Sequence, residues 1–92
     1  MAHSLSAKKR IRQNEKQRAH NRARRTAIKT RLRAFSDALA GGDPAVAETR
    51  YREACKLLDR EANHGLIHRN TAARSKSRLA HRLNMLKTKS SS

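Results

Sequence analysis

The chain is poor in cysteine, in aromatic residues and in long apolar runs. Cys55 is its one cysteine, so no disulfide can form within the chain, and its helical context predicts a small buried apolar side chain. No apolar run approaches the roughly 20 residues of a membrane-spanning helix. Residues 1–10 contain neither the apolar stretch nor the cleavage site of a secretory signal. These absences favour a protein of the reducing cytoplasm.

Acidic residues are also scarce, with 7 Asp and Glu against 23 Lys and Arg, a net charge of +16 and a sequence pI of about 11.7. Residues 1–33 hold twelve Lys or Arg and one acid, residues 34–64 hold four and six, and residues 65–92 hold seven and none. Two basic ends therefore flank a nearly neutral middle. An imbalance of this size predicts an anionic partner, which can be nucleic acid, a membrane surface or an acidic protein.

Strand signals are almost absent, and the abundant Ala, Arg, Lys, Leu and Glu are good helix formers. Gly41-Gly42 and Gly65 predict helix ends, because glycine readily adopts the left-handed C-terminal conformation. Asp43-Pro44 predicts a helix start with an Asp N-cap, and Asn70 predicts another. The sequence therefore predicts one all-α domain over residues 1–92, with helices over 6–40, 44–63 and 71–88 and a tail over 89–92.

Each predicted helix carries one apolar stripe at helical spacing. The stripes consist of Ile28, Leu32, Phe35 and Leu39 in the first helix, of Ala47, Tyr51, Ala54, Leu58 and Ala62 in the second, widened by Val46 and Leu57, and of Ala72, Leu79, Leu83 and Leu86 in the third. Three stripes joined by short connections predict a small three-helix bundle with a thin core.

Residues 6–25 have no face to contribute to this bundle, because their basic residues point to all sides of a helix. We therefore expect the first helix to be long, basic and projecting, with about 30 Å beyond the bundle. Like charges three and four residues apart should fray it in the absence of a partner. Charge on every side suits a helix that lies between nucleic-acid strands, and a disordered basic tail is the alternative.

The third predicted helix has a basic face opposite its leucines, formed by Arg74, Arg78 and His81. Arg69 and Asn70 lie at its N-terminus, where free backbone N–H groups and the helix dipole favour an anion. This face is either a second anion-binding surface or an ordinary solvated basic face.

No set of residues predicts catalysis or a bound metal. His64 and His68 are four residues apart, but Gly65 breaks the helix that would align them, and no cysteine pair is available for zinc. The acids of the middle segment are Asp37, Asp43, Glu48, Glu53, Asp59 and Glu61. We expect them to act as helix caps and as surface partners of Arg50, Arg52, Lys56 and Arg60. We therefore expect a non-enzyme with no cofactor, no metal and no small-molecule substrate.

Residues 65–79, GLIHRNTAARSKSRL, resemble the C-terminal signature of the bacterial family of small-subunit ribosomal protein number twenty. The usual form of that signature is close to G-L-I-H-K-N-K-A-A-R-x-K-S-R-L, so Arg69 and Thr71 stand where Lys is usual. The N-terminal S-A-K-K-R is similar to the same family, as are Gln13, Glu15-Lys16, Arg18, Asn21 and Lys29-Thr30. The resemblance covers nearly the whole chain.

The resemblance implies a three-helix bundle with a long first helix that binds 16S ribosomal RNA directly. It also implies an early role in small-subunit assembly, contacts to the 5′ domain and to the long penultimate RNA helix, and neighbouring small-subunit proteins as further partners. Together with the charge pattern it identifies the candidate RNA-binding residues, which are Lys8, Lys9, Arg10, Arg12, Lys16, Arg18, Asn21, Arg22, Arg24, Arg25, Lys29, His68, Arg69, Asn70, Arg74, Lys76, Arg78 and His81.

This composition suits the recognition of double-stranded RNA, which proteins read mainly through shape, phosphates and 2′-hydroxyls. The scarcity of aromatics argues against a single-strand reader that stacks bases, and Asn21 and Asn70 are the best candidates for a specific polar contact. A DNA-binding architectural or regulatory protein is the alternative, although Gly41-Gly42 ends the helix before a leucine zipper could form. A membrane-active peptide is disfavoured because residues 6–25 offer only Ile11 to an apolar face.

Overall fold

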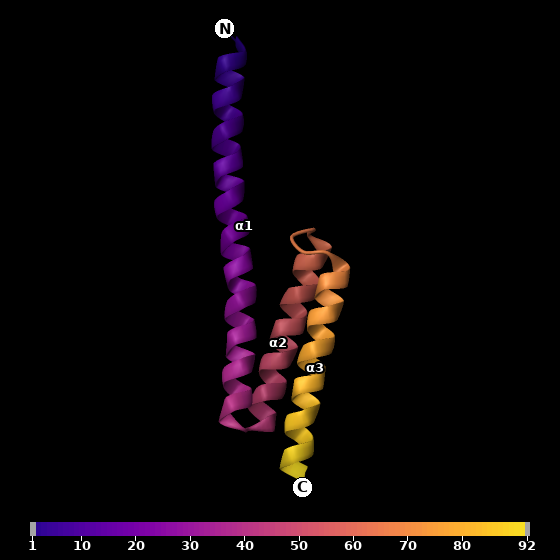
Figure 1. The fold of residues 1–92 in the computed structure, drawn as a ribbon. Helices are drawn as coiled ribbons and strands as arrows, with labels where there is room; N and C mark the ends of the chain where they lie inside the picture. Colours follow the sequence, from indigo (N-terminus) through magenta and orange to yellow (C-terminus); the bar gives the residue numbers. More distant parts are fainter. Residues whose placement is uncertain (1, 92) are drawn as a thin grey trace.

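The computed structural model describes residues 2–91, and the side chains of residues 5–89. It contains three helices, α1 (Ala2–Gly41), α2 (Pro44–Asn63) and α3 (Arg69–Ser91), with no strand among the described residues (Figure 1). The predicted all-α fold with a long first helix is confirmed. Both outer helices are longer than predicted, and α3 continues through residues 89–91, where the sequence predicted a tail. No glycine or proline interrupts the chain after Gly65, so nothing in the local sequence ends the helix earlier.

The connection between α1 and α2 follows the predicted helix-end signals. Gly42 has a φ of 77°, in the left-handed region that favours glycine, and its N–H donates to the Leu39 carbonyl. Asp43 is the N-cap of α2, because its Oδ1 accepts a hydrogen bond from the Ala45 N–H at 3.0 Å, and Pro44 occupies the first turn. Gly42 and Asp43 therefore form the whole connection between α1 and α2 and reverse the direction of the chain.

The second connection begins at Gly65, which has a φ of 79°, and the Leu66 N–H closes the end of α2 by donating to the Glu61 carbonyl. α3 begins at Arg69, and its cap is His68 rather than the predicted Asn70. The His68 carbonyl accepts from the Ala72 N–H, and its Nδ1 accepts from the Asn70 N–H at 3.0 Å. A ring nitrogen two residues before Asn70 therefore takes the role that the sequence assigned to the Asn70 amide oxygen.

The three helices lie side by side with α2 in the middle (Figure 1). α2 packs along both of its neighbours, whereas α1 and α3 scarcely touch each other. The N-terminal half of α1 extends beyond the ends of α2 and α3, and the principal extents of 73 × 23 × 13 Å reflect this rod beside a flat layer. Among the described residues, none of the helices combines the length and the apolarity that a membrane crossing requires.

The core is small and follows the predicted stripes. Its buried members are Phe35, Ala47, Ala54, Leu58, Ala72, Leu79 and Leu83. Val46 is 43 % exposed rather than part of the stripe, because it faces an open recess beside the small side chains of Ala34 and Ala38. Cys55 is half-buried where the sequence predicted burial, since it lies on the flank of α2 rather than on the core face.

Phe35 is the one large apolar side chain with no exposed surface among the described residues, and three helices enclose it. The Tyr51 ring of α2 packs on it with centroids 6.2 Å apart. The Arg82 guanidinium of α3 lies 5.7 Å from the Phe35 ring centroid and within 3.4 Å of the Ser36 hydroxyl. A cation–π contact therefore links the two outer helices where few other contacts do.

Candidate nucleic-acid interface

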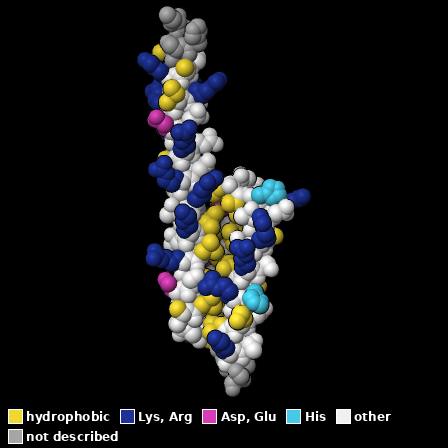
Figure 2. Space-filling model, viewed as in Figure 1, with side chains coloured by type: hydrophobic (Ala, Val, Ile, Leu, Met, Phe, Trp, Pro, Cys, Tyr) yellow, Lys and Arg dark blue, Asp and Glu magenta, His cyan; other side chains and the backbone are white. Residues whose placement is uncertain are grey.

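The projecting part of α1, residues 5–20, is exposed at every position. At 100° per residue its cations point to all sides of the helix, and Figure 2 shows dark-blue side chains at both edges of this rod. They form no ion pair with any side chain that the structure describes. The cations of this segment are Lys8, Lys9, Arg10, Arg12, Lys16 and Arg18.

The next segment of α1 lies beside the bundle, which corrects the predicted extent of the projection. Asn21 and Arg24 are half-buried, so the rod ends near residue 20 rather than at residue 25. On the exposed side, side chains spaced by four, three and four residues line a shallow groove with Asn21 and Thr26. These side chains are Arg18, Arg22, Arg25 and Lys29. Their spacing places four cations in one row along the helix.

Arg24 differs from its basic neighbours because it is engaged inside the protein. Its Nη2 lies 2.6 Å from Oε2 of Glu61, a carboxylate that is only 2 % exposed. Arg60 Nε lies 3.5 Å from the other oxygen of Glu61. Oε2 accepts no hydrogen bond, so the ion pair with Arg24 is the main interaction that offsets the cost of burying this charge. Glu61 was predicted as a surface partner and is buried instead, and Arg24, a candidate RNA-binding residue, pairs with it between α1 and α2.

The basic face of α3 is arranged as predicted. Arg74, Arg78 and His81 are exposed, as are the candidates at the start of the helix, His68, Arg69 and Asn70. Lys76 differs, because its Nζ lies 2.9 Å from Oδ1 of Asp59 and forms an ion pair with α2. Hydrogen bonding to the Asp59 carboxylate raises the pKa of Lys76, because the carboxylate favours the charged ammonium form.

The acids of α2 carry the interhelical ion pairs. Arg24 and Arg31 of α1 pair with Glu61 and Glu53, and Lys76 and Lys87 of α3 pair with Asp59 and Glu48. The predicted pairs of these carboxylates with Arg50, Arg52 and Arg60 also form, and the interhelical pairs are additional to them. The acids therefore face the two neighbouring helices, and the cations on the outer side of α2 keep their charge exposed.

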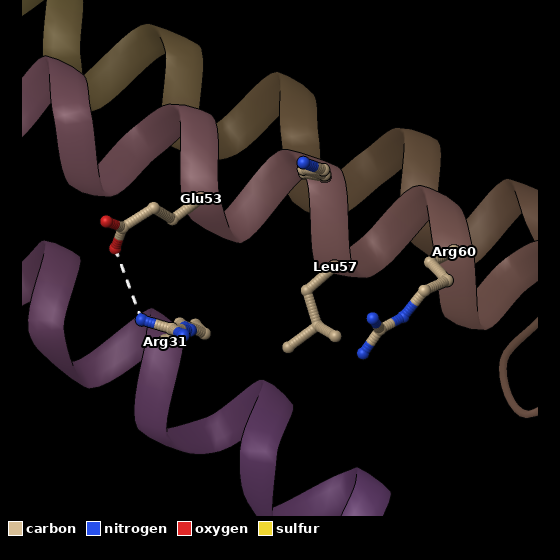
Figure 3. A pocket seen from close by; sticks show the side chains of 5 residues that line it. Arg31, Glu53, Leu57 and Arg60 are labelled. Carbon is tan, nitrogen blue, oxygen red and sulfur yellow. Dashed lines mark hydrogen bonds and ion pairs between the residues drawn. The ribbon is translucent and has the colours of Figure 1, made fainter.

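Two of those cations and one cation of α1 line a groove between α1 and α2 that the sequence did not predict as part of the interface. Arg31, Lys56 and Arg60 surround it, with Leu57 and Glu53 (Figure 3). Sequence reasoning missed the groove because residues 34–64 are nearly neutral in sum. The signal that could have revealed it is the i, i+4 spacing of Lys56 and Arg60, which places both on one side of α2.

No group of three or more His, Cys, Asp or Glu side chains within the described range could hold a metal ion. The candidate surface therefore consists of cations and amides, whose chemistry is the binding of phosphate and polar groups. Arg offers paired N–H donors to a phosphate, and Lys offers a point charge.

Comparison with known proteins agrees with this arrangement. The family model described as Ribosomal protein S20 matches residues 2–84. The small ribosomal subunit protein bS20 of Corynebacterium diphtheriae is 48% identical over 86 residues, which cover 94% of this chain and 99% of the relative. That of Acinetobacter baumannii is 51% identical over 79 residues, covering 86% and 90%, and that of Shouchella clausii is 48% identical over 86 residues, covering 94% and 98%. With a match over nearly its whole length, this chain belongs to the ribosomal protein S20 family.

Proposed function

We propose that this protein is a structural, non-catalytic component of the small ribosomal subunit that binds 16S ribosomal RNA directly and supports subunit assembly. Its family and the printed names of its relatives support the ribosomal role. The observation that carries direct RNA binding is the rod of α1, whose cations surround the helix and pair with no described side chain. Such a rod needs phosphates on several sides to neutralise it.

The proposed mechanism uses two surfaces of the same molecule. The rod and the row from Arg18 to Lys29 bind the RNA backbone, with Asn21 placed to add a polar contact to a 2′-hydroxyl or a base edge. The exposed face of α3, with Arg74 and Arg78, forms the second surface. α2 packs along both helices through the core and also forms ion pairs with them, so a bound RNA would meet the two surfaces at a fixed separation.

Competition between RNA and DNA tests this function. The full chain should bind 16S ribosomal RNA more tightly than duplex DNA of equal length at one salt concentration. Cross-linking to total cellular RNA, with the linked nucleotides mapped, should then recover 16S sequences. Equal affinity for the two nucleic acids, with cross-links scattered over unrelated RNAs, would favour the DNA-binding or architectural alternative and contradict the proposal.

A further inference from the structure

α2 is nearly neutral in sequence, but its acidic side chains pair with the neighbouring helices while some of its basic side chains point to solvent. Its carboxylates Glu48, Glu53, Asp59 and Glu61 all form ion pairs with α1 or α3. Lys56 and Arg60 point away from the core, and the described side chains offer Lys56 no ion pair. The folded molecule therefore presents positive charge on a helix whose composition does not predict it.

The groove between α1 and α2 brings a third cation to the same place. In Figure 3 the side chains of Arg31 from α1 and of Arg60 from α2 both extend into the space between the helices, on either side of Leu57. Arg31 is 51 % exposed and Arg60 66 % exposed, so both guanidinium groups are accessible. Glu53 lines one end of the groove and shares its carboxylate between Arg31 and Arg50. The lining thus holds three cations and one carboxylate, and although Arg31 pairs with that carboxylate and Arg60 with Glu61, the net charge of the lining is positive.

We propose that this groove binds a phosphate group of the RNA backbone, held by Lys56 and Arg60 with Arg31 opposite. The inference rests on the proposed function and adds a third contact surface, on the middle helix, to those on α1 and α3. A phosphate suits the groove because two guanidinium groups can each donate paired N–H bonds to its oxygens, and the Lys56 ammonium adds charge. The apolar Leu57 side chain offers no donor or acceptor that would compete.

Substitution of Lys56 tests the groove, because that side chain is exposed and unpaired among the described residues. Binding of the full chain to 16S ribosomal RNA is measured between about 50 and 200 mM salt. Lys56→Gln should weaken binding severalfold and reduce the slope of log K against log salt by about 1. Arg60→Gln should do the same, and Lys56→Arg should restore wild-type binding.

Arg52→Gln is the matched control, since it removes the same charge from the same helix. Arg52 does not line the groove, so its loss should leave the slope unchanged if the groove holds the phosphate. If the wild-type chain binds 16S ribosomal RNA while Lys56→Gln and Arg60→Gln behave like Arg52→Gln, the groove proposal is wrong and the proposed function stands. A wild-type chain that does not prefer this RNA to DNA would overturn the proposed function and this inference with it.

Discussion

At the scale of single residues, three arginines that lie close together on α1 have different surroundings. Arg22, Arg24 and Arg25 lie within one turn of α1, yet only Arg24 reaches the buried Glu61 carboxylate. A buried carboxylate is costly unless a cation compensates it, so Arg24 serves the fold. Its neighbours remain exposed and available to a partner.

Substitution of Arg24 should therefore affect stability first. Arg24→Gln should lower the free energy of unfolding by about 1–3 kcal/mol, because it deprives a buried acceptor of its main partner. Urea denaturation followed by circular dichroism measures this change. The matched variant Arg22→Gln should change stability by less than about 0.5 kcal/mol, because that side chain is exposed.

The double variant Arg24→Gln/Glu61→Gln adds a second check. Removing both charges should recover part of the stability that Arg24→Gln loses, since no uncompensated buried carboxylate remains. Equal stability of Arg24→Gln and Arg22→Gln would show that the ion pair contributes nothing to the fold.

Cys55 gives a second prediction at this scale. Burial raises the pKa of the Cys55 thiol, and the interaction with Tyr51 opposes this only in part. A raised pKa means less reactive thiolate at any given pH. Alkylation by iodoacetamide should therefore be slower in the folded chain than in urea, and its pH midpoint should lie higher. A folded chain that reacts as fast as the unfolded one at every pH would contradict this.

At the scale of elements, α1 has two parts, and the structure places the boundary between them near residue 20 rather than at residue 25. Residues 5–20 are exposed, and of these His20 lies in a recess beside α2, whereas the segment from Asn21 onward packs beside α2 and forms the Arg24–Glu61 and Arg31–Glu53 pairs. The structure has one uninterrupted helix through both parts. The rod is held only by its own backbone hydrogen bonds, and its like charges weaken it.

Amide hydrogen exchange should separate these two parts. In the free protein, residues 8–20 should exchange much faster than residues 28–39, because only the latter are protected by packing on the core. Ribosomal RNA should slow exchange in residues 8–20 by neutralising the repulsion. Equal strong protection of both stretches in the free protein would mean that the rod is rigid without RNA.

At the scale of the whole molecule, the ion pairs organise the charge. In the interhelical pairs α2 contributes the acids and both neighbours contribute cations, and exposed cations remain on the rod, on the row from Arg18 to Lys29, on the exposed face of α3 and on the outer side of α2. The molecule is therefore an elongated cation with a small core, and its extents of 73 × 23 × 13 Å give it a large surface for its size.

This layout predicts a steep dependence of RNA binding on salt. If the exposed cations neutralise about 6–10 phosphates, affinity should fall by about 10³–10⁵ between about 50 and 200 mM salt. Filter binding to 16S ribosomal RNA over a salt series measures the slope. An affinity that hardly changes over this range would rule out an interface dominated by phosphate contacts.

The sequence by itself determined the three helices and the core stripe. Gly42, Asp43-Pro44 and Gly65 act through local backbone conformation and capping, so the start of α2 and the ends of α1 and α2 could be predicted from neighbours along the chain. The stripe around Phe35 follows from helical periodicity alone. Family membership confirms the expected ribosomal, non-enzymatic chain.

Only the tertiary structure decided which charges remain exposed. Periodicity gives the angle of a side chain around its own helix, but the helix that it meets depends on how the three helices pack. Packing buried Glu61 against Arg24, attached Lys76 to Asp59, and left Lys56 facing solvent beside Arg31. Each of these outcomes joins residues far apart in sequence, so no count of charge along the chain could distinguish an exposed cation from one that pairs with a neighbouring helix.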